Sequence, residues 1–115
     1  MNPIIKQRWV EALRSGNYIQ GTGFLRQDRD GTPGDKWCCL GVLCDLAAQD
    51  GYGHWEGDSI VGVYVDGLEH KVETMPSDLI LEWSGVAATD ADALANMNDN
   101  GDSFATIAEH IEGSL

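Results

Sequence analysis

The longest apolar run of the chain is Trp37-Cys38-Cys39-Leu40-Gly41-Val42-Leu43-Cys44-Asp45-Leu46, which contains all three cysteines. A run this apolar must be buried, so it marks the centre of the fold. Leu40, Leu43, Cys44 and Ala47 recur at three- and four-residue spacing. This spacing places them on one face and predicts a helix over about 39–49, ended by the glycines at 51 and 53.

Helical patterns also appear on both sides of this central helix. Asn2-Pro3 is typical of a helix start, and apolar residues at helical spacing predict a helix over about 3–15, ended by Gly16. A short helix is predicted to open at Thr74-Met75-Pro76 and to stop at Gly85. Two more are predicted at about 90–100 and 103–112. A Thr89–Asp92 capping box marks the start of the first of these helices. Ser103 marks the start of the second, and Gly113 marks its end.

Strand signals lie in two places. The turn-rich segment 28–35 separates residues 24–25 from residues 37–38, which predicts a β-hairpin with a long tip. The β-branched and aromatic segment 60–65, the turn pair Asp66-Gly67 and segment 68–72 predict a second hairpin. With 115 residues and 43% hydrophobic content, the chain suits one domain over residues 1–115. We expect a small α+β fold, mostly helical, with a minor antiparallel sheet.

The charge of the chain is unevenly distributed. The net charge is −12, yet residues 1–36 hold six of the seven basic residues and only four of the nineteen acids. An acidic balance of this size repels nucleic acid and anionic membranes. Its plainest role is to keep the protein soluble or to adapt it to a salty habitat, and it could also attract a basic partner or divalent cations. Polar residues near the N-terminus do not fit a signal peptide, no apolar run is long enough to span a membrane, and the odd cysteine count favours reduced thiols. We therefore expect a cytoplasmic protein.

A thiol nucleophile is one possible chemistry. Cys38 and Cys39 lie near the expected start of the central helix, where the helix dipole lowers a thiol pKa. His70 follows on an expected strand, which is the chain order of papain-like hydrolases. The opposing interpretation is that the cysteines are small buried hydrophobic residues, because no local signature of those enzymes is present.

Metal binding and DNA binding are weaker alternatives. The cysteines, His54 and His70 lack the paired spacing of structural zinc sites, and segment 96–102 lacks the final glutamate of a calcium loop. We therefore predict no metal and no cofactor. Residues 94–108 have the apolar spacing of a helix-turn-helix, but residues 89–115 contain six acids and no Lys or Arg. A helix that reads DNA needs the opposite charge, so we predict a helical hairpin that does not bind nucleic acid.

Three pieces of the sequence resemble one family. They are residues 9–16 of the first helix, the run Cys38–Leu46, and residues 97–112, which include Asn98-Asp99-Asn100-Gly101-Asp102-Ser103-Phe104. Their order and spacing resemble small uncharacterised proteins of phages and actinobacteria. The resemblance implies a small non-enzymatic accessory or interaction protein, with a basic protein as a possible partner. The alternative is a small cysteine-dependent hydrolase that uses Cys38 or Cys39 with His70.

Overall fold

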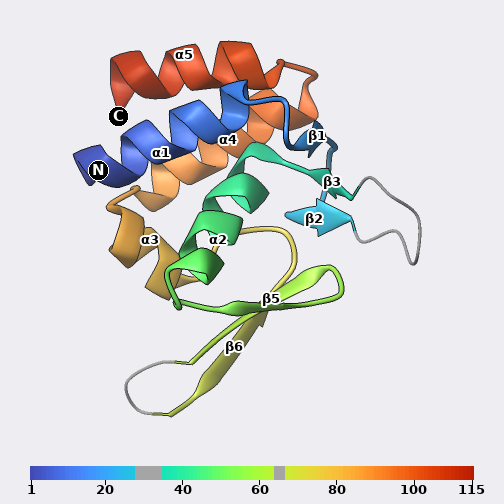
Figure 1. Ribbon diagram of the computed structural model, residues 1–115, viewed down its shortest axis with the longest axis vertical. Coiled ribbons are helices and arrows are strands. Elements are labelled where there is room, and N and C mark those ends of the chain that lie inside the picture. Colours follow the sequence, from blue (N-terminus) through green and yellow to red (C-terminus); the bar gives the residue numbers. More distant parts are fainter. Residues whose placement is uncertain (28–34, 64–66) are drawn as a thin grey trace.

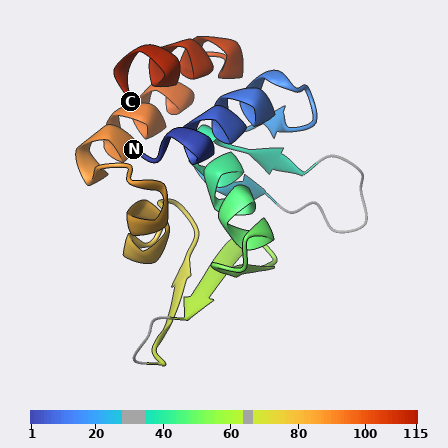
Figure 2. The ribbon, with the colours of Figure 1, turned by 60° about the vertical axis from the view of Figure 1, so that its left-hand side comes forward.

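The computed structural model of the chain describes residues 1–27, 35–63 and 67–115, and its central element is helix α2 (Cys39–Gln49). Eight of the eleven residues of α2 are buried, as expected for a helix that is apolar on nearly every side. Figures 1 and 2 show α2 in the middle of the molecule, with helices above it and a small sheet below. The predicted helix over 39–49 is confirmed.

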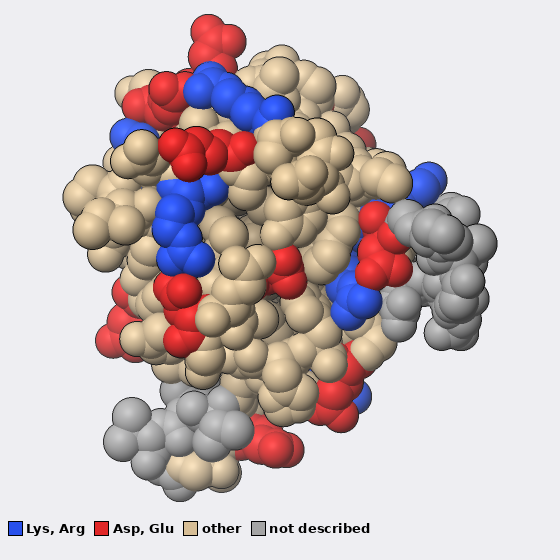
Figure 3. Space-filling view, in the orientation of Figure 1, with Lys and Arg blue, Asp and Glu red and all other residues tan. Residues whose placement is uncertain are grey.

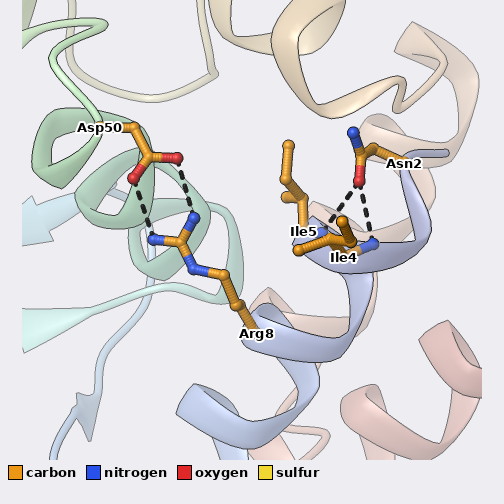
Figure 4. A network of polar contacts seen from close by, with 5 residues as sticks. All are labelled: Asn2, Ile4, Ile5, Arg8 and Asp50. Carbon is orange, nitrogen blue, oxygen red and sulfur yellow. Dashed lines mark hydrogen bonds and ion pairs between the residues drawn. The ribbon is translucent and has the colours of Figure 1, made fainter.

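Helix α1 (Pro3–Arg14) begins as its sequence predicts. The Asn2 Oδ1 atom accepts hydrogen bonds from the backbone N–H groups of Ile4 (2.9 Å) and Ile5 (3.2 Å), as Figure 4 shows. One turn further on, Arg8 donates to both carboxylate oxygens of Asp50, at 2.8 Å and 3.3 Å. Asp50 follows the last residue of α2, so this ion pair joins the middle of α1 to the end of the central helix.

The remaining helices are α3 (Asp78–Ser84), α4 (Ala88–Asp99) and α5 (Phe104–Ser114). Ser77 caps α3, so that helix begins later than the proline-led segment had predicted, and Gly85 ends it with a φ of 75°. Ser103 caps α5 as predicted.

Two predicted helix-end signals are wrong. Helix α4 begins at Ala88, which puts Thr89 inside the first turn, and no side chain caps its N-terminus. The capping box therefore does not form. Gly113 does not end α5 either, because the helix continues through Ser114.

Helix α1 packs against α5 and α2, and α4 packs against α2 and α5 (Figures 1 and 2). Of the two helices that were predicted to form a hairpin, α4 thus lies on the central helix, whereas the main neighbour of α5 is α1. The buried residues of α5, at 104, 107, 108 and 111, instead complete the core beside α1.

Sheet A joins three two-residue strands in the order β1 (Ile19–Gln20), β3 (Lys36–Trp37), β2 (Arg26–Gln27). Strands β2 and β3 are antiparallel, which confirms the first predicted hairpin; most of its expected tip, residues 28–34, lies outside the described residues. Strand β1 pairs with β3 in parallel, which the sequence did not indicate. These short strands close over the start of α2.

Sheet B is an antiparallel meander in the order β4 (His54–Glu56), β5 (Ser59–Val63), β6 (Glu69–Val72). Strands β5 and β6 form the second predicted hairpin, with Val63 opposite Glu69, although Tyr64, Val65 and Asp66 lie outside the described residues. Strand β4 was not predicted. Within residues 1–27, 35–63 and 67–115, five helices and two small sheets surround one apolar cluster, which confirms the expected α+β, mostly helical fold.

Candidate functional site

The three cysteines are buried and present no reactive thiol at the surface. Cys38 is 5% exposed, and Cys39 and Cys44 are fully buried. The Cys38 sulfur accepts from the Gly41 N–H (3.3 Å), and the Cys39 thiol donates to the Leu94 carbonyl (3.6 Å). Burial raises the pKa of all three thiols, which outweighs any lowering by the start of α2. These thiols serve the core and lack the properties of an activated nucleophile.

His70, the other half of the hydrolase alternative, occupies a different part of the molecule. It is exposed on β6, opposite Gly62 of β5. Figures 1 and 2 show β6 beyond the C-terminal end of α2, whereas Cys38 and Cys39 lie at its N-terminal end. The contacts of the Cys38 and Cys39 sulfurs are with backbone groups. The described structure therefore does not assemble a cysteine–histidine pair from these residues.

Potential metal ligands are also dispersed. Within the part of the chain that the structure describes, no three His, Cys, Asp or Glu side chains come close enough together to hold an ion. His54 is exposed on β4 and lies 3.3 Å from the Glu56 carboxylate. Among these same residues, no helix combines the length and apolarity needed to cross a bilayer.

A cluster of aromatic rings surrounds the Asp45 carboxylate. Asp45, on α2, accepts from the Tyr18 hydroxyl (2.5 Å) and from the Trp55 indole N–H (3.0 Å). Trp37 contacts both of these rings edge-on, at centroid distances of 5.1 and 5.4 Å. Burial and the Asp45 carboxylate raise the Tyr18 pKa. The cluster joins both sheets to α2, so its role is structural.

Arg26 closes the outer side of this cluster. Its guanidinium lies 5.5 Å from the ring centroids of both Trp37 and Trp55 and donates to Asp35 at 2.7 and 3.0 Å. A cation over aromatic faces with a carboxylate beside it is a stabilising arrangement. Because Arg26 occupies these aromatic faces, they are not available to a ligand.

Residues 97–104, between α4 and α5, are held by a buried amide that sequence reasoning missed. Asn98 is fully buried; its Oδ1 accepts from the Cys39 N–H and from Gln20, each at 3.1 Å, and its Nδ2 donates to the Gly21 carbonyl at 2.7 Å. Gln20 in turn accepts from the Phe104 N–H at 3.1 Å. The two amides thus satisfy the first N–H groups of α2 and α5.

Gly41 explains a second feature of the cysteine run. A Cβ atom at this position would lie 1.7 Å from the carbonyl oxygen of Leu25, because the segment before β2 crosses directly over the first turn of α2. The same carbonyl accepts from the Cys38 N–H at 3.2 Å. The observed contacts of the cysteine run and of residues 97–104 are therefore packing and backbone contacts.

Exposed carboxylates without an ion pair are found on α3, α4 and α5, which we call the acidic helices. Residues 78–115 contain eight acids and no Lys or Arg. Arg14 of α1 pairs with Glu112, and the Asp99 carboxylate accepts from the Gly23 N–H. Five other carboxylates are exposed and form no ion pair within the described residues: Asp78, Glu82, Asp90, Asp92 and Glu109.

The basic residues do not form a comparable surface. Arg8 and Arg14 each pair with a carboxylate from another helix or its end, and Arg26 pairs with Asp35 of its own hairpin. Figure 3 accordingly shows Lys and Arg side chains interspersed with acidic ones, with no continuous basic patch on the face drawn. The exposed carboxylates of the acidic helices that form no ion pair are therefore available to a cation from a partner.

Comparison with known proteins adds a family assignment. No curated protein and no solved structure matches the chain. A family model matches residues 1–115, which is the full length of the sequence. The chain therefore belongs to the family described as a domain of unknown function, DUF8296.

Proposed function

We propose that this protein is a non-enzymatic interaction protein that binds a basic protein partner through the acidic helices. The observation that carries the proposal is the group of five exposed carboxylates without a cation, in a segment that contains no Lys or Arg. Such like charges repel one another in the free protein, and a basic partner would relieve this repulsion. The burial of the three thiols gives the hydrolase alternative no support.

Other features agree with this role. Complementary charge steers association and favours one class of partner, while phosphate backbones would be repelled. The resemblance to phage proteins adds support, because phage-encoded accessory proteins often act by binding host machinery. Reduced thiols fit a cytoplasmic setting, which we include in the proposal.

The test uses two variants that lose the same number of charges. Asp90→Asn/Asp92→Asn/Glu109→Gln neutralises part of the acidic helices, and Glu11→Gln/Glu56→Gln/Glu69→Gln neutralises three exposed acids elsewhere. The tagged wild type and each tagged variant are used to capture partners from lysates of the source organism. The recovered partner is then titrated with each purified protein at increasing salt concentration.

We expect a basic partner whose binding weakens with salt, is reduced in the first variant and is nearly unchanged in the second. A random DNA duplex should not bind at physiological ionic strength. An acidic partner, or equal loss of binding in both variants, would contradict the use of the acidic helices. Salt-sensitive binding to the duplex would contradict the choice of a protein partner.

A further inference from the structure

We propose that Tyr52 and Trp83, together with the carboxylates of Asp78 and Glu82, form the docking site for a Lys or Arg side chain of the basic partner. This inference rests on the proposed function and names the place where the partner binds most specifically. The two rings come from different elements, the turn after α2 and helix α3, and their centroids lie 5.7 Å apart with planes tilted by 38°.

Tyr52 is an exposed aromatic residue on a fixed backbone. Its side chain is 42% exposed, although its N–H donates to the Ala47 carbonyl at 2.9 Å. Its own carbonyl lies against Gly62 of β5, where an added Cβ would be 3.4 Å away. A rigid ring loses little entropy when it is covered by a partner, which is why tyrosine is enriched among the residues that dominate binding energy.

Helix α3 presents an acidic row beside an apolar row. Asp78 and Glu82 are four residues apart, so they lie on one side of the helix and both are exposed. Leu79 and Trp83 form the neighbouring row and are half-buried. Two like charges at this spacing destabilise a helix, and no cation within the described residues pairs with either of them. A cation from a partner would therefore meet carboxylates and aromatic faces together.

The same combination is already satisfied elsewhere in this fold. Arg26 lies over Trp37 and Trp55 and is paired with Asp35. At α3 the two rings and the carboxylates are present, and the described residues place no cation over these rings. The contact of Arg26 with Trp37, Trp55 and Asp35 thus has the same chemistry as the contact that we assign to the partner. An exposed cation–π contact of this kind contributes about 0.5–1 kcal/mol, which is a change in affinity of roughly two- to fivefold.

The probe for this site is a short oligoarginine peptide without aromatic residues. Nuclear magnetic resonance spectra record the backbone amides and the indole N–H signals of the four tryptophans during a titration. Trp9 is fully buried and serves as an internal reference. We expect the Trp83 indole and the amides around Tyr52 and α3 to shift, while the Trp9 signal stays in place.

Variants then separate this site from general charge attraction. Asp78→Asn/Glu82→Gln should weaken binding more than the matched pair Asp90→Asn/Asp92→Asn on α4. Tyr52→Ala should weaken binding by about two- to fivefold, and Tyr52→Phe should retain it, because the ring is what contacts the cation. Thermal denaturation of each variant confirms that it is folded, and Trp83 is left unchanged because it packs against the core.

The outcomes distinguish this inference from the proposed function. If the peptide binds but the Trp83 signal does not move and both charge pairs weaken binding equally, the docking site is wrong and binding by the acidic helices stands. If neither oligoarginine nor oligolysine binds at low salt, both the site and the proposed function are contradicted.

Discussion

Because Gly41 has no Cβ atom, the first turn of α2 can lie directly against the backbone of Leu25. Gly41→Ala would place a methyl group against the backbone of Leu25, and backbone cannot move aside as a side chain can. We expect a loss of stability of at least about 1–3 kcal/mol, the range for overpacking. Gly113→Ala is the matched control, since that position is helical and open, and it should be neutral or stabilising. Denaturation midpoints of the two variants in urea should move in different directions or by clearly different amounts.

Asn98 provides a second test at the level of one side chain. Asn98→Ala leaves the buried Cys39 N–H without its acceptor and removes the donor to the partly buried Gly21 carbonyl. We expect a cost of at least about 1–3 kcal/mol, the range for one buried unsatisfied group. Asn96→Ala, at an exposed position of the same helix, should change stability little. A similar unfolding free energy for both variants would show that the buried amide is dispensable.

The sequence predicts the burial of the cysteines but not the hydrogen bonds of the Asn98 amide, and the reason is physical. The apolar neighbours of Cys38 and Cys39 predict burial directly. Asn98 looks like an ordinary polar residue near a helix end, and the backbone group that it serves is 59 residues away along the chain. Partners at such distances are invisible to local patterns. The one available signal was the resemblance of segment 97–104 to other proteins, which carried no chemical explanation until the fold was known.

At the level of elements, the interface between α1 and α5 is held by apolar contacts. Ile111 is fully buried, whereas its neighbour Glu112 pairs with Arg14 at the surface. We expect Ile111→Ala to cost about 2–5 kcal/mol and Glu112→Gln less than about 1 kcal/mol. Chemical denaturation of the two single variants measures both values. A larger effect of the surface variant would mean that the ion pair governs the docking of α5.

Sequence patterns predicted the long helices well but did not predict strands β1 and β4. The helix at 3–14 has the Asn2-Pro3 start signal, the helix at 39–49 has a long apolar stripe, and both were predicted closely. Strands β1 and β4 have two and three residues, which is too short to show alternation. The pairing of β1 with β3 also depends on Gln20, whose amide binds Asp102 and Phe104 from the opposite end of the chain. Tertiary contacts thus create these strands.

At the scale of the whole molecule, the buried thiols should make the folded protein less stable at alkaline pH. Their pKa values are raised in the folded protein, so the folded state keeps its protons while the unfolded thiols ionise near pH 8.5. Stability is therefore complete below that pH and falls as the pH rises above it. Each thiol contributes a slope of up to about 1.4 kcal/mol per pH unit. Unfolding free energies between pH 8.5 and 10 should fall less steeply in Cys44→Ala than in the wild type; equal slopes would refute the assignment.

The side-by-side arrangement of α1 and α5 also has a consequence for the time course of synthesis. A ribosome makes residues 3–14 first and residues 104–114 much later, yet these two helices pack side by side. Helix α1 can pack on α2 earlier, because the Trp9 indole donates to the Cys39 carbonyl, but its contact with α5 forms only after α5 has been translated. Domains usually fold as units during translation, so closure of this core is expected to follow synthesis of α5. Until then the side of α1 that faces α5 is exposed to chaperones.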